Sequence, residues 1–140
     1  MRLKSIQLQN FRCYEDLKIE LDKNFNIILG INGTGKTAIL EAARIAIGSL
    51  YSEFDKIENK ISSPGINTDD VRLHNGERQY EVHILTEACV SESISSSLMK
   101  NEPIIWERTL ERHGGRTKFV GAEEIKAVSK KIKKIVRNSG

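Results

Sequence analysis

The chain has 140 residues, of which 39% are hydrophobic and 29% are charged, and its net charge is +3. This length allows about one domain with a substantial hydrophobic core, and the composition is ordinary for a globular protein. No apolar run approaches the roughly 18 residues that a membrane span requires, and the N-terminus lacks the apolar centre of a secretory signal. We therefore expect a cytoplasmic protein without a membrane segment.

Two strands are predicted at the N-terminus. Apolar residues at positions 3, 6 and 8 indicate the first strand, and alternation of apolar and charged residues over 17–22 indicates a second, half-buried strand. A polar turn at 22–24 precedes the apolar run 25–29. This run predicts a third and more deeply buried strand beside the first two.

Residues 30–37 read Gly-Ile-Asn-Gly-Thr-Gly-Lys-Thr and match the phosphate-binding loop pattern G-x-x-x-x-G-K-[ST], between a predicted strand and a predicted helix. The three glycines allow positive φ and turn successive N–H groups towards an anion, which the helix N-terminus also favours. We expect Lys36 to reach the β- and γ-phosphates and the Thr37 hydroxyl to bind Mg²⁺. A tight turn before a helix would require neither residue at these offsets.

The helix predicted over 38–50 is apolar on several sides and is expected to be nearly surrounded by protein. Residues 51–78 carry many turn signals and predict a long, partly irregular excursion. Within it, Asp69 and Asp70 could approach the nucleotide or Mg²⁺, but an exposed turn is the simpler interpretation.

Alternation over 79–90 and 104–110 predicts two strands that pair antiparallel across a Ser-rich connection. Trp106 is expected to pack in the core rather than to stack on a base. Apolar residues at helical spacing then predict an amphipathic helix within 121–140. Its basic outer face could bind a polyanion, or could be an ordinary solvated face.

The cysteines and histidines form no recognisable cluster in the sequence. Cys13 and Cys89 fit neither a disulfide framework nor a paired zinc site, so we predict two buried thiols. His74, His83 and His113 lie in unrelated contexts, which argues against a metal centre or a catalytic triad.

Segments 8–14 (LQNFRCY) and 27–42 (IILGINGTGKTAILEA) resemble the N-terminal lobe of an ABC-type ATPase head of the RecF, SMC and OLD group. The later segments 68–72 (TDDVR) and 105–108 (IWER) are similar to small bacterial AAA-family ATPases described as virulence-associated, with Septu-type and retron-associated anti-phage ATPases as near relatives. The resemblance implies an α/β P-loop NTPase fold with a mixed sheet, an antiparallel hairpin and flanking helices.

The resemblance also implies Mg-ATP as the ligand, in a protein of DNA repair or anti-phage defence. It places the binding residues at Arg12, Gly30, Asn32, Gly33, Thr34, Gly35, Lys36, Thr37 and Ala38. Thr37 is the implied metal ligand. Arg12 could instead be a surface ion-pair partner.

ATP hydrolysis in such heads also needs a Walker B strand ending in Asp-Glu, a Ser-Gly-Gly signature helix and a Gln loop, and the sequence contains none of them. No catalytic residue is identified. We expect one incomplete lobe that binds ATP without turnover, made of strands, loop and helix (1–50), excursion (51–78), hairpin (79–120) and basic helix (121–140). Expected partners are a second copy, a complementary ATPase lobe, a nuclease and DNA or RNA.

Two alternatives stay open. The chain could be part of a longer ATPase that dimerises around ATP, or a short interaction module that regulates a full-length ATPase. A P-loop kinase or GTPase is disfavoured because a hairpin precedes the motif and no Asn-Lys-x-Asp sequence is present.

Overall fold

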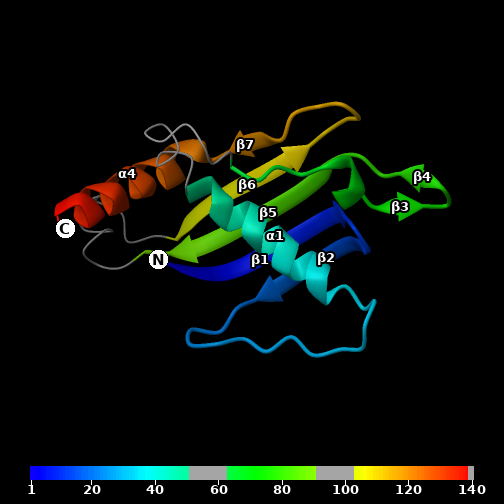
Figure 1. Ribbon diagram of the computed structural model, residues 1–140, viewed down its shortest axis with the longest axis horizontal. Coiled ribbons are helices and arrows are strands. Elements are labelled where there is room, and N and C mark those ends of the chain that lie inside the picture. Colours follow the sequence, from blue (N-terminus) through cyan, green and yellow to red (C-terminus); the bar gives the residue numbers. More distant parts are fainter. Residues whose placement is uncertain (51–62, 91–102, 139–140) are drawn as a thin grey trace.

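The computed structural model describes residues 1–50, 63–90 and 103–138. Its centre is a five-stranded sheet with the order β2-β1-β5-β6-β7 (Figure 1). The strands are β1 (Arg2–Phe11), β2 (Tyr14–Glu20), β5 (Val82–Cys89), β6 (Ile104–Leu110) and β7 (Lys118–Val120). All four pairings are antiparallel.

The predicted strand pairs are confirmed. β1 pairs with β2 in a register that places Ile6 opposite Ile19 and Leu8 opposite Leu17. β5 pairs with β6, which has the predicted bounds of 104–110. The Ser-rich connection between β5 and β6 lies in 91–102, outside the described residues, as does the first part of the excursion, 51–62.

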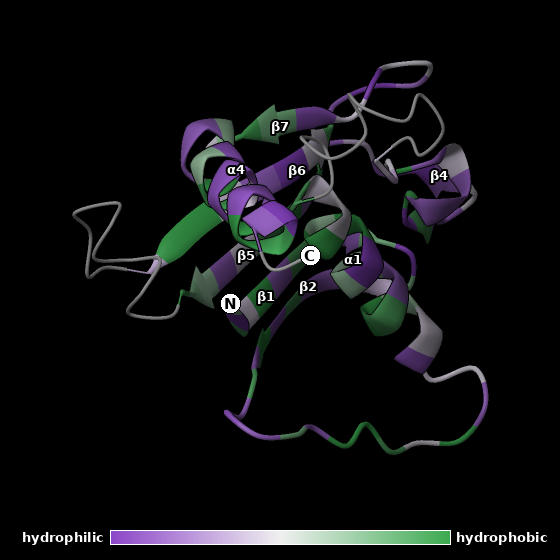
Figure 2. Ribbon diagram, turned by 60° about the vertical axis from the view of Figure 1, so that its left-hand side comes forward, coloured by the Kyte–Doolittle hydropathy of each residue, from purple (hydrophilic) through white to green (hydrophobic). Residues whose placement is uncertain are grey.

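Two helices lie over the same face of the sheet (Figures 1 and 2). α1 (Lys36–Gly48) packs on β1 and β5, and α4 (Ala122–Asn138) packs on β6. The inward residues of one cluster come mainly from β1, β5 and α1, and those of the other from β6 and α4. The predicted α/β class therefore holds, and the final amphipathic helix is confirmed. No helix in the described residues is both long and apolar enough to cross a membrane.

β6 fixes the C-terminal end of α1 through two side chains. The Trp106 indole N–H donates to the Ala46 carbonyl at 3.2 Å, and the ring is fully buried, which confirms the predicted core role of Trp106. The Arg108 guanidinium donates to the Ser49 hydroxyl at 3.1 Å, and burial lowers the pKa of Arg108. A cation beside the last turn of a helix complements the negative end of its dipole. α1 is thus held at the end opposite its phosphate-binding loop.

The prediction of a buried strand over 25–29 is wrong. These residues form no strand and join no sheet among the described residues, and Leu29 is 87% exposed. Figure 1 shows the segment between β2 and α1 running well away from the sheet. Its apolar residues have no neighbouring strand to pack against, so the sheet is antiparallel rather than mixed across the described strands.

Three further elements differ from the sequence prediction. α1 is not nearly surrounded by protein, because Leu40 and Arg44 lie on an exposed outer face. The excursion contains a 3₁₀ turn, η2 (Thr68–Asp70), and a small hairpin of β3 (Leu73–His74) and β4 (Glu77–Arg78). The sequence analysis also missed β7, which has only three residues.

Candidate nucleotide-binding site

An open cavity of about 270 Å³ lies between the β1–β2 turn, the loop 30–37 and the N-terminal end of α1. Its lining residues are Arg12, Cys13, Asn32, Gly33, Gly35, Lys36, Thr37 and Ala38. The structure therefore brings most of the predicted binding residues together. Gly30 and Thr34 do not line the cavity, and instead take part in the internal bonding of the loop.

The phosphate-binding loop depends on glycine at two of its positions. Gly33 and Gly35 have φ angles of 85° and 91°, which L side chains rarely adopt. Gly35 also has no room for a side chain, since a Cβ atom there would lie 2.4 Å from the Tyr14 hydroxyl. α1 begins directly after Gly35 without a side-chain cap, so its first N–H groups are available to an anion.

The loop is bonded mainly to itself. The Lys36 ammonium group donates to the Gly30 and Ile31 carbonyls, and the Thr34 hydroxyl donates to the Ile31 carbonyl at 2.7 Å. Lys36 is half-exposed and lines the cavity, so it can exchange carbonyl oxygens for phosphate oxygens. The exposed Thr37 hydroxyl makes no hydrogen bond within the described residues and suits a hard cation such as Mg²⁺.

The β1–β2 turn contacts the loop through Cys13 and Tyr14. The Tyr14 hydroxyl donates to the Thr34 carbonyl at 3.3 Å. Partial burial, and to a lesser extent the Cys13 thiol, raises the pKa of Tyr14. Cys13 itself is exposed at the cavity, so the prediction of a buried thiol is wrong for this residue. The hairpin turn reaches outward to the loop and leaves the Cys13 side chain at the surface.

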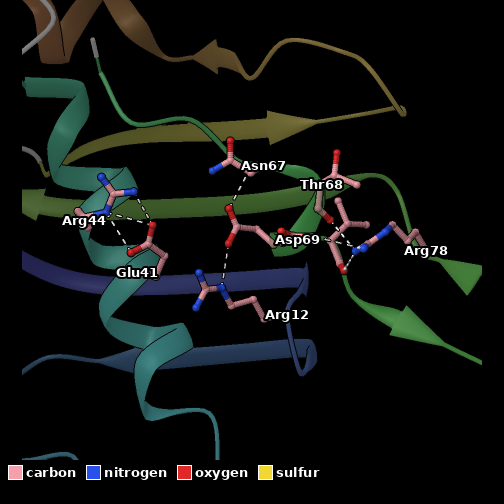
Figure 3. Close-up of polar contacts among 9 residues, drawn as sticks. Arg12, Glu41, Arg44, Asn67, Thr68, Asp69 and Arg78 are labelled. Carbon is pink, nitrogen blue, oxygen red and sulfur yellow. Dashed lines mark hydrogen bonds and ion pairs between the residues drawn. The ribbon is translucent and has the colours of Figure 1, made fainter. Parts of the chain in front are cut away.

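Arg12 makes the ion pair that its sequence position suggested, and it also lines the cavity. Its Nε donates to the Asp70 carboxylate at 2.8 Å, a bond drawn as a dashed line from Arg12 in Figure 3. The backbone of Arg12 is left-handed, with φ of 51°. This conformation is uncommon for a non-glycine residue and orients the side chain at the turn.

The excursion is bonded to this turn. The Arg12 N–H donates to the Asp70 carbonyl at 2.7 Å, and the Arg72 N–H donates to the Asn10 carbonyl at 2.9 Å. Phe11 and Val71 form an isolated antiparallel bridge between the two bonds. The prediction of an exposed turn is therefore wrong for Asp70, which is 2% exposed, because the main-chain pairing draws it under the turn.

Asp69 does lie in an exposed turn, where its carboxylate pairs with Arg78 at 3.4 Å. From the sequence, Asp70 is only an acid that could approach the nucleotide, and an exposed turn is the preferred interpretation. One signal was present: Asn67 followed three residues later by an acid is the spacing of a capping box. The Asp70 carboxylate indeed accepts the Asn67 N–H at 2.9 Å, and this bond fixes the carboxylate within its own turn.

A glycine-rich loop, a lysine and a threonine at a helix N-terminus, beside an antiparallel sheet, define the N-terminal lobe of a P-loop nucleotide-binding protein. A family model described as an AAA domain matches residues 5–140. The chain belongs to this family, and it is an N-terminal lobe of the ABC type found in RecF-like and SMC-like ATPases.

Relatives are found among proteins of DNA maintenance. The chain is 30% identical over 135 residues to structural maintenance of chromosomes protein 6 of Saccharomyces cerevisiae, covering 95% of this chain and 11% of that protein. It is 62% identical over 42 residues to the DNA replication and repair protein RecF of Lactococcus lactis subsp. cremoris, covering 30% of this chain and 12% of that protein. It is 50% identical over 48 residues to the DNA double-strand break repair Rad50 ATPase of Archaeoglobus fulgidus, covering 34% and 5%.

The fold also matches a solved structure from a study of ATP-driven dimerization and DNA-stimulated activation of SMC ATPases. The TM-score is 0.63 with 18% identity, and the match covers 91% of this chain and 77% of that one. This likeness shows the fold. The chain spans about an eighth or less of the length of the three curated relatives above.

Proposed function

We propose that the chain binds Mg-ATP in the cavity at the N-terminus of α1. The observation that carries this proposal is the convergence of Lys36, Thr37 and Arg12 on one cavity beside uncapped N–H groups. The β- and γ-phosphates would bind Lys36 and the loop N–H groups, and Thr37 would hold Mg²⁺. Bound Mg²⁺ would neutralise charge on the phosphates.

We propose further that this lobe does not hydrolyse ATP alone. Within the described residues, no carboxylate lines the cavity. Phosphoryl transfer needs a group that positions the attacking water and further stabilisation of charge on the phosphates. Lys36 and Thr37 can hold a nucleotide, but they do not supply a base. A complementary lobe would have to contribute that part of the reaction.

The exposed run 25–31 supports the need for such a lobe. Phe25, Ile27, Leu29 and Ile31 are each exposed and directly precede or enter the phosphate-binding loop. Apolar side chains gathered in one exposed segment mark an interaction site more often than a free surface. We propose that a strand of the complementary lobe pairs with this run. The complete protein would then be a homodimeric ATPase that acts on DNA in repair or anti-phage defence. A nuclease would be a further partner.

A nucleotide titration tests the binding proposal. Wild-type chain is expected to bind Mg-ATP, and Lys36→Ala is expected to weaken binding by at least about a hundredfold, since it removes a charge-assisted contact to two phosphates. Lys130→Ala is a matched control, because Lys130 is an exposed lysine on α4. Equal affinity for the wild type and Lys36→Ala would refute the proposal.

A phosphate-release assay on the same samples tests turnover. We expect no release above background from the chain alone. Release that Lys36→Ala abolishes would show that the lobe hydrolyses ATP by itself. The alternative role, an interaction module, predicts a complex with a full-length ATPase that forms equally well without nucleotide. Intact-mass measurement of the native protein would establish whether the chain is part of a longer ATPase.

A further inference from the structure

Asp70 does not line the cavity, and its carboxylate accepts a hydrogen bond from Arg12, 58 residues away in sequence. Both carboxylate oxygens are engaged: Oδ1 accepts Arg12 Nε at 2.8 Å and Oδ2 accepts the Asn67 N–H at 2.9 Å. The carboxylate can therefore neither rotate nor leave the turn without losing a hydrogen bond. A carboxylate held on two sides is a fixed support for a flexible arginine.

The bond to Asp70 uses only the Nε edge of the guanidinium. Figure 3 shows a dashed hydrogen bond at one edge of the Arg12 guanidinium, with its other nitrogens on the side of α1. The terminal nitrogens of Arg12 make no hydrogen bond within the described residues, and the side chain is part of the cavity lining. An arginine has five N–H donors in a rigid fork, so fixing one edge also directs the others.

We infer that Asp70 is a positioning residue for nucleotide binding: it orients Arg12 so that the terminal nitrogens of its guanidinium face the phosphates of the bound nucleotide. This inference rests on the proposed function, because it needs a phosphate ligand in the cavity. Asp70 does not line the cavity and acts only through Arg12. Two backbone hydrogen bonds, which together form the antiparallel bridge at Phe11 and Val71, keep the pair in register.

Asp70 and its neighbour Asp69 are expected to differ in their effect on nucleotide binding. Asp69 carries the same charge one residue earlier, but its side chain is 96% exposed and pairs with Arg78. A general effect of negative charge near the site would make the two acids equivalent. Positioning of Arg12 requires only Asp70, so Asp69→Asn is the matched control for Asp70→Asn.

A double-mutant cycle on Mg-ATP affinity tests the inference. Asp70→Asn keeps the side-chain shape but removes the charge and one acceptor, and it is expected to weaken binding by about three- to tenfold. Arg12→Ala is expected to weaken binding by about tenfold. Asp70→Asn added to Arg12→Ala is expected to cause no further loss beyond about twofold, because residues that act as one unit are not additive. Asp69→Asn is expected to bind like the wild type.

A purely structural role for Asp70 would give a different result. Asp70→Asn would then weaken binding equally in the wild type and in Arg12→Ala, and this would overturn the inference. Unchanged affinity in Asp70→Asn, or in Arg12→Ala, would overturn it as well. If binding is also insensitive to Lys36→Ala, the proposed function itself fails, so the two failures are distinguishable.

Folding is checked in each variant by its melting temperature and by the fluorescence of Trp106, which is the one tryptophan in the chain. If Asp70→Asn does not fold, Arg12→Lys provides the test. Lysine keeps the positive charge but has a single side-chain nitrogen, so it cannot bond Asp70 and direct other nitrogens towards the phosphates as arginine does. Binding by Arg12→Lys is therefore expected to be as weak as by Arg12→Ala, and wild-type affinity would overturn the inference.

Discussion

Two stretches of this chain, β6 and the run 25–29, both have sequences typical of strands but lie in opposite environments. β6 lies between β5 and β7, and it buries Ile104 and Trp106. The run 25–29 has no partner strand among the described residues, and most of its apolar side chains are exposed. Main-chain donors and acceptors need partners, and apolar side chains need a covering layer. The described residues give β6 both main-chain hydrogen-bond partners and a covering layer, and they give the run neither a partner strand nor a covering layer. This difference is the physical basis for proposing a complementary lobe.

The largest effect is expected at the packed interface between α1 and the sheet. Ile45→Asp would place an unpaired charge at a fully buried position between α1 and the sheet. We expect a loss of at least about 4 kcal/mol in the free energy of unfolding, enough to unfold a domain of ordinary stability. Urea unfolding followed by Trp106 fluorescence measures it.

Leu40→Asp is the matched control for Ile45→Asp. Leu40 lies on the same helix and is 63% exposed, so the same substitution should cost less than about 1 kcal/mol. A chain that keeps both its stability and its nucleotide binding in Ile45→Asp would show that α1 is not packed on the sheet as described.

Trp106→Phe is expected to have the second-largest effect. The substitution removes volume from a fully buried site and leaves the Ala46 carbonyl without its 3.2 Å donor. We expect a loss of about 2 kcal/mol in the free energy of unfolding, from lost packing and one hydrogen bond. Circular dichroism must follow the unfolding, since the fluorophore is gone. A change below about 0.5 kcal/mol would contradict the described packing of β6 on α1.

An ion pair on the outer face of α1 is expected to contribute less. The Arg44 guanidinium donates to Glu41 and lowers the pKa of that carboxyl, with smaller effects of burial and other charges. Because the folded-state pKa is lower than the unfolded one, the pair stabilises the protein above about pH 4.5, and this contribution is lost as the pH falls through the folded-state value. Arg44 is mostly exposed, so the gain is at most about 0.5 kcal/mol.

Glu41→Gln checks this pH dependence. At pH 7 the variant should be slightly less stable than the wild type in urea, and the difference should vanish in acid, where Glu41 is protonated. A difference that grows towards low pH would mean that the pKa of Glu41 is raised rather than lowered.

The sequence predicted the local features of the molecule well and the long-range ones poorly. The loop 30–37, β6 and α4 follow from residue patterns that act over a few positions. The role of Asp70 depends on main-chain pairing with the β1–β2 turn, which no local pattern encodes. The run 25–29 carries the pattern of a strand, but a strand forms only where a neighbour is present.

Leu29→Ser is expected to have the smallest effect on the chain alone, within about 0.5 kcal/mol, although it replaces a large apolar residue beside the phosphate-binding loop. Leu29 has almost no contact to lose, being 87% exposed. Urea unfolding of the isolated chain measures this, and a loss above about 1 kcal/mol would show that the run is packed after all. In an assembled ATPase head the same substitution should weaken association of the two lobes, because the run would then be buried. The two measurements together distinguish two cases. If the run is a strand that lacks its partner, only association of the lobes is weakened, and if it is an ordinary loop, neither measurement changes.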